Sequence, residues 1–268
     1  MLVKLFKQEM KAKGRVMLLI YEVLAAVTLL IVMVGIYNQH VQSRMSHIIY
    51  AVSGAVYLIT IPVLVIIAFI YLCVSFYQSM YTAQGYLTHT LPVKTTSILN
   101  IKIAASLAHM MLTAAVVFVL AVISGLIIDR TVVYELWHML GPAMQNIYEQ
   151  TGVHGAVFIG SAVVMMFLGC LDALLLFFAG SSIGQLFHRS KGAWGIAAGI
   201  SLYYMSQIIS IFAAALLAAF LTEKYSGNLS DLVILSWMIP GTMAVLGFWA
   251  VVYYLISRVI VQKHLNLE

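Results

Sequence analysis

Charge is what this sequence has least of. Only 9% of its 268 residues are charged, whereas 63% are hydrophobic, and the mean hydropathy is +1.02. A soluble globular domain carries charge on roughly 25% of its residues. The composition therefore excludes an ordinary soluble domain and indicates an integral membrane protein.

Motifs for catalysis and for metal binding are also missing. A phosphate-cradling loop of the form GxxxxGK[ST] requires a Gly-Lys pair, which the sequence lacks, so we expect no ATP hydrolysis by this chain. HExxH and CxxC are absent and the eight histidines are scattered, so we expect no metal and no other cofactor. The two cysteines, Cys73 and Cys170, fall within apolar runs, which excludes an external disulfide framework.

What the chain does contain is a series of long apolar runs, each near the roughly 20 residues that an α-helix needs to cross a bilayer. They are too long and too uniformly apolar for the alternating strands of a membrane barrel. We therefore predict an all-α integral membrane protein with six transmembrane helices in a single membrane domain, residues 1–268. The predicted spans are Val16–Ile36, Ser53–Ser79, Ile103–Ile128, Ala156–Gly184, Ala193–Leu221 and Thr242–Ser257.

The distribution of Lys and Arg predicts the orientation. With the N-terminus inside, eleven of the 14 basic residues are cytoplasmic and three are external, which favours cytoplasmic N- and C-termini by the positive-inside rule. The expected location is the cell membrane, as a multi-pass protein. The net charge of +5 then reflects topology and attraction to anionic lipid headgroups, and gives no reason to invoke nucleic acid.

The N-terminal residues 1–15 have an amphipathic pattern. On a helical wheel the apolar side chains gather on one side and the polar ones on the other, which predicts a helix lying in the membrane surface. A basic tail that only sets the topology is the alternative. The apolar side carries Leu2, Val3, Phe6 and Met10, and the polar side carries Lys4, Lys7, Gln8 and Lys11.

Two further segments interrupt the simple series of spans. Residues 129–155 form the longest predicted external loop, and apolar residues at helical spacing predict a short helix resting on the outer leaflet. Near the C-terminus, Pro240-Gly241 lies in the middle of a 33-residue region, Leu229 to Val261. Because proline breaks or kinks a helix, we predict a short or re-entrant helix over Asp231–Ile239 before the sixth span. A single kinked helix is the alternative.

A few polar side chains fall inside the predicted spans. Asp172 lies near the middle of the fourth span, where a carboxylate costs about 2.5–3.5 kcal/mol on insertion scales. It could be a counter-ion for a cationic substrate or a site that titrates, or else a protonated acid bonded to a Tyr or Ser. Tyr57 and Thr60 in the second span, and Tyr203 and Gln207 in the fifth, could line a substrate pathway or act as polar contacts between helices.

The sequence GSSIG, Gly180 to Gly184, matches the string of a hydrolase nucleophile elbow centred on Ser182. That motif requires a turn between a strand and a helix, whereas here it ends an apolar helical run. Small residues let helices approach closely, and Gly195 and Gly199 supply a second pair at the same spacing. We therefore interpret the motif as a packing surface.

The predicted cytoplasmic loop between spans two and three, residues 80–102, carries the sequence GYLTHTLPV. It resembles bacterial ABC type-2 transporter permeases, in which a Gly-Tyr-Leu-Thr-x-Thr-Leu-Pro-Val run follows the second span. The resemblance implies a coupling helix that docks on a separate ATP-binding-cassette subunit. Gly85 and Pro92 would bound a short rigid element; its apolar contacts would come from Tyr86, Leu87 and Leu91, and its polar rim from His89 and Lys94.

The resemblance further implies the permease half of an ABC exporter. Two six-span chains, identical or homologous, would combine with two ATPase subunits that hold ATP and Mg, and would move an amphiphilic peptide, drug or lipid by alternating access. Spans two and five would face the central cavity, with Tyr57, Thr60, Tyr203 and Gln207 as lining candidates. The alternatives are an ATP-independent secondary transporter using Asp172, an intramembrane enzyme acting through Ser182, and a protein of assembly or sensing that transports nothing.

Overall fold

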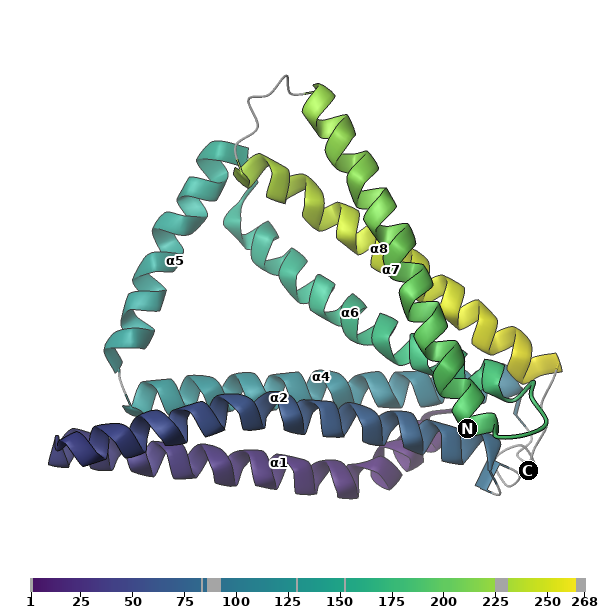
Figure 1. Ribbon diagram of the computed structural model, residues 1–268, viewed down its shortest axis with the longest axis horizontal. Coiled ribbons are helices and arrows are strands. Elements are labelled where there is room, and N and C mark those ends of the chain that lie inside the picture. Colours follow the sequence, from purple (N-terminus) through teal and green to yellow (C-terminus); the bar gives the residue numbers. More distant parts are fainter. Residues whose placement is uncertain are drawn as a thin grey trace. The chain divides into compact units, whose positions relative to one another are not determined.

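The computed structural model describes residues 2–82, 84–85, 93–128, 130–151, 153–224 and 231–263, and this part of the chain is helical throughout its regular structure (Figure 1). Six of the helices are long and apolar enough to cross a membrane, which confirms the predicted number of spans. The seventh described helix, α5 (Arg130–Thr151), is not among them. The helices are α1 (Leu2–Val41), α2 (Arg44–Tyr81), α4 (Thr95–Ile128), α5 (Arg130–Thr151), α6 (Gly155–Gly184), α7 (Lys191–Lys224) and α8 (Asp231–Lys263).

Large apolar side chains cover the outer surfaces of these helices. Leu58 of α2 and Leu216 of α7, for example, are 71% and 72% exposed. In water such surfaces would drive aggregation, whereas lipid tails solvate them. The exposed apolar faces therefore support a multi-pass membrane protein.

The chain divides into two compact units. The first contains Met1–Val74 and Ala104–Leu140, so it holds α1 and most of α2 and α4. Hydrogen bonds join α1 to α4 near both ends: Lys13 Nζ donates to Ser106 Oγ over 2.8 Å, and Gln39 Nε2 donates to the Ile128 carbonyl. The two helices therefore run parallel, while α2 returns in the opposite direction.

The second unit contains Ser75–Ile103 and Gly141–Glu268. Its central element is α6, which packs along both α7 and α8. The last turns of α2 and the first turns of α4 also belong to this unit, so α2 and α4 each contribute to both units.

Glycines bring α6 and α7 into backbone contact. A Cβ atom at Gly180 would lie 2.7 Å from Gly199 Cα, and one at Gly184 would lie 2.5 Å from the Lys191 carbonyl oxygen. Real Cβ atoms do not approach backbone so closely, so only glycine permits this packing. The geometry confirms that GSSIG is a packing surface.

The N-terminal segment differs from its prediction in one respect. Residues 2–15 are helical, but they form no separate helix, because α1 continues without interruption from Leu2 to Val41. The reason lies at Lys13, whose side chain is only 1% exposed and is held by Ser106 and, at 3.8 Å, by Glu9. This contact binds the end of the predicted surface helix to α4, so the segment does not lie by itself in the membrane surface.

The predicted break before the last span is wrong. Instead, α8 is continuous from Asp231 to Lys263 with Pro240 inside it, as in the alternative of one long helix. Proline removes one backbone donor, but the helical hydrogen bonds on either side remain and membrane helices tolerate this loss. Thr242, where the sixth span was predicted to begin, lies inside α8, and its Oγ1 donates to the Met238 carbonyl oxygen of the same helix over 2.8 Å.

The predicted loop over residues 129–155 does contain a helix. It is longer than expected, because α5 extends over 22 residues and passes through Pro142.

The glycine contact makes a stability prediction. Replacing Gly180 with Ala should destabilise the protein by about 1–3 kcal/mol, because the added methyl group meets the backbone of α7 and has no room to move. Gly169→Ala is the matched control in the same helix, since a Cβ there meets nothing within 4 Å. The measurement is the thermal unfolding of both variants in lipid nanodiscs. Equal stability of the two variants would contradict the backbone contact.

Candidate functional site

An aromatic and polar contact within the second unit joins the end of α2 to the end of α6. The rings of Phe76 and Phe178 stack with centroids 3.6 Å apart and planes 11° apart, and both side chains are fully buried. One turn further on, the Tyr81 hydroxyl lies 2.7 Å from Ser182 Oγ. We call these four residues the junction.

Helical spacing explains why the junction forms. Phe178 and Ser182 are four residues apart and share one face of α6, while Phe76 and Tyr81 point from successive turns of α2. Ser182 Oγ also donates its only hydrogen to the Phe178 carbonyl oxygen over 2.7 Å. The Tyr81 hydroxyl is therefore the donor to Ser182, and both buried hydroxyl groups are satisfied.

The start of α4 is fixed to the same unit by a second contact. The Tyr254 hydroxyl of α8 donates to Asn100 Oδ1 over 2.9 Å, and Ile98 and Leu99 are buried beside it in the chain. The end of α2 is thus held by α6, and the start of α4 by α8.

The predicted coupling residues lie within this connection. Gly85 is buried and its N–H donates to the Thr82 carbonyl oxygen over 2.7 Å, while Lys94 is exposed and its carbonyl oxygen accepts the Ser97 N–H over 2.8 Å. The other five residues lie outside the described part of the chain: Tyr86, Leu87, His89, Leu91 and Pro92.

Ser182 has the surroundings of a structural residue. It lies inside α6, its side chain is 0% exposed, and its hydrogen bonds in the described part of the chain go to Tyr81 and to a backbone carbonyl. Neither partner is a base that could activate a nucleophile. The geometry therefore favours packing over the hypothesis of an intramembrane enzyme.

Two of the predicted pathway residues belong to the first unit and make contacts within it. The half-buried Tyr57 places its hydroxyl 3.3 Å from Thr28 Oγ1 on α1. Thr60 Oγ1 donates to the Val56 carbonyl oxygen over 2.7 Å, within its own helix. Both polar groups have partners, which is the arrangement expected of polar contacts in a bundle.

The other three predicted residues belong to the second unit. Tyr203 and Gln207 are exposed on α7, and Asp172 of α6 is half-buried. The Oδ1 atom of Asp172 is enclosed and has no hydrogen-bond partner among the described residues. Of the five predicted residues, Asp172 is the one whose charge is not accounted for by a described contact.

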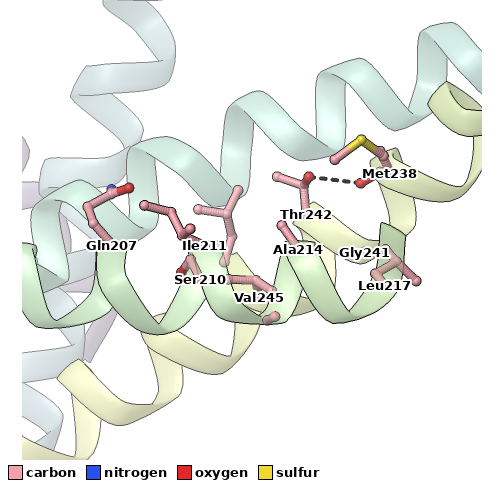
Figure 2. Close-up of a pocket in the computed structure, with 11 residues that line it drawn as sticks. Gln207, Ser210, Ile211, Ala214, Leu217, Met238, Gly241, Thr242 and Val245 are labelled. Atoms are coloured by element: carbon pink, nitrogen blue, oxygen red, sulfur yellow. Dashed lines mark hydrogen bonds between the residues drawn. The ribbon is translucent and has the colours of Figure 1, made fainter. Parts of the chain in front are cut away.

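Two pockets lie along α7. The larger, of about 490 Å³, lies between α7 and α8 and extends from Gln207 to Leu217 (Figure 2). Its polar side chains are Gln207, Ser210 and Thr242, and the rest of its lining is apolar or small. The second pocket, of about 410 Å³, lies between α6 and α7 and includes Tyr203. Tyr203 and Gln207 therefore line different pockets.

The described ranges contain no group of three or more His, Cys, Asp or Glu side chains that could hold a metal ion.

A double-mutant cycle tests the junction. Ser182→Ala should cost about 1–3 kcal/mol of stability, because it leaves the buried Tyr81 hydroxyl without an acceptor. Tyr81→Phe should cost less, about 0.5–1.5 kcal/mol, since Ser182 keeps its bond to the Phe178 carbonyl. The double variant should be more stable than the sum of the single effects predicts, measured by unfolding in nanodiscs. Strict additivity would mean that the two hydroxyl groups do not interact.

Comparisons with known proteins add no assignment. No family model matches the chain, and neither the curated proteins nor the solved structures contain a match. The functional assignment therefore depends on the motif at Gly85–Val93 and on the geometry around it.

Proposed function

We propose that this chain is the transmembrane permease subunit of an ABC exporter, on which a separate ATPase docks at the α2–α4 connection. The observation that supports it most is the junction. The Phe76–Phe178 stack and the Tyr81–Ser182 hydrogen bond fix the end of α2, and the Asn100–Tyr254 hydrogen bond fixes the start of α4.

Such fixing is what an ATP-driven switch requires. A force applied to a connection that is free of its surroundings would be lost in local motion, whereas close-packed side chains transmit displacement. Residues 75–103 belong to the second unit, and both α2 and α4 continue from them into the first. A push on this connection therefore acts on both units, which is the kind of input that a rigid-body transition needs.

The partners follow from what the chain lacks. Since it has no P-loop, ATP and Mg would be bound by the ATPase subunit, and a second six-span permease, identical or homologous, would complete the pathway. The pockets along α7 are mostly apolar with a few polar groups, a combination that suits an amphiphilic substrate. The docking side would be cytoplasmic, in line with the distribution of Lys and Arg.

An ATP-independent secondary transporter is the second candidate. It is favoured by the enclosed, unpartnered Oδ1 of Asp172, since acidic residues at membrane depth often serve in ion or proton pathways. This function needs no ATPase, so the partner of the purified chain separates the two candidates.

Docking is tested by one substitution in the connection. We expect a P-loop ATPase to co-purify in equal amount with the tagged chain from its native membrane. Leu91→Asp should abolish this association, because it places a charge in an apolar contact that excludes water. The measurement is quantitative mass spectrometry of the purified complex.

The matched control is Leu136→Asp, the same substitution at an exposed position of α5, on the predicted opposite side of the membrane. It should leave the ATPase bound. Retention of the ATPase by Leu91→Asp, or its absence from the unmodified protein, would refute the proposal. Both variants are checked for equal amounts in the membrane, so that loss of the ATPase is not confused with loss of the permease.

A further inference from the structure

We propose that Asp172 binds the positively charged group of the substrate, and that the pocket between α6 and α7 receives the aromatic or apolar body attached to it. This rests on the proposed transport function and narrows the substrate class to lipophilic cations.

The first observation is that Asp172 lacks a compensating charge. It lies twelve residues before the end of α6, or about 18 Å along the helix axis, so it is far from the headgroups at that end. The sequence of α6 contains no Lys or Arg, and the basic residues of α7 and α8 lie near the helix ends. The ion pair between Lys13 and Glu9 lies in the other unit.

The second observation concerns the carboxyl group itself. Its Oδ1 is buried without a hydrogen-bond partner in the described part of the chain, yet the residue as a whole is only half-buried. A protonated acid used as a structural contact would be expected to bond a neighbouring hydroxyl or carbonyl. An enclosed acceptor beside an accessible edge instead fits a carboxylate whose partner arrives from outside the chain.

A buried tyrosine of α8 lies near this position. The Tyr253 hydroxyl of α8 lies near both Asp172 and Ser206 of α7, so three helices meet here. This hydroxyl is also buried without a hydrogen-bond partner among the described residues, so it does not satisfy the Asp172 carboxyl group. The ring of Tyr253 stacks on that of Trp249 with centroids 5.6 Å apart.

The pocket between α6 and α7 supplies the apolar part of the site, and Asp172 lies one helical turn outside its lining. Its α6 wall begins at Leu176, one turn beyond Asp172, and continues with Phe177. Tyr203 and Tyr204 form the α7 wall, and Gly195 and Gly199 line the side where α7 packs closely against α6. By contrast, the polar side chains of the α7–α8 pocket are uncharged, so that pocket does not select a charge.

Two ions of nearly the same shape and opposite charge test the proposal. Equilibrium dialysis measures binding of tetraphenylphosphonium and of tetraphenylborate to the purified protein in phosphatidylcholine nanodiscs, with empty nanodiscs subtracted. Tetraphenylphosphonium should bind saturably to the unmodified protein. Asp172→Asn should weaken this binding about 10-fold or more, because the carboxylate charge is lost, while Asp172→Glu should largely retain it. Tetraphenylborate should bind no more weakly to Asp172→Asn than to the unmodified protein.

The control is Glu22→Gln, which removes an exposed acid from α1 in the other unit and should leave tetraphenylphosphonium binding unchanged. The proposal is overturned if the unmodified protein shows no saturable binding, if Asp172→Asn binds tetraphenylphosphonium as tightly, or if it loses both ions equally. Binding needs no ATPase, so Leu91→Asp should bind the cation normally. Loss of docking and loss of cation recognition are therefore separate results.

Discussion

The backbone contact between α6 and α7 is the constraint on which the second unit depends. In lipid, helices gain little from hiding apolar side chains, so close packing and hydrogen bonds must hold them together. Gly180 and Gly184 provide the closest packing available, helix backbone against helix backbone. While these glycines of α6 hold α7, Phe178 and Ser182 at the same end of α6 contact α2. One end of α6 therefore positions both a neighbouring span and the connection that we propose as the docking site.

The first unit solves the same problem with polar groups. Lys13 and Ser106, Tyr21 and Thr113, and Thr28 and Tyr57 form hydrogen bonds that follow α1 along much of its length. The bilayer core supplies no water to satisfy these polar side chains, so they bond to each other, and the pairs hold the helices in register. Tyr57 is one of these contacts between helices. By contrast, the Oδ1 of Asp172 has no described partner, and this difference is the basis for proposing that Asp172 binds substrate.

Much of this fold could be predicted from the sequence, because the length of an apolar run and the spacing of glycines are local properties. The six spans, the GSSIG packing surface and the unusual position of Asp172 were accessible in this way. The continuity of α1 was not, because it depends on Lys13 meeting Ser106, 93 residues away. The junction was hidden for the same reason, since nothing local shows which of 15 tyrosines meets Ser182. The break predicted at Pro240 was wrong, because the helical hydrogen bonds on either side of the proline keep α8 continuous.

The most direct test of the proposed function is the mass of the intact complex. Native mass spectrometry of the protein released from its own membrane with bound lipid should show two six-span permeases, at least one of them this 29.5 kDa chain, together with two P-loop ATPase subunits. A particle made of this chain alone, under conditions in which other ABC complexes of the same membrane remain whole, would contradict the account.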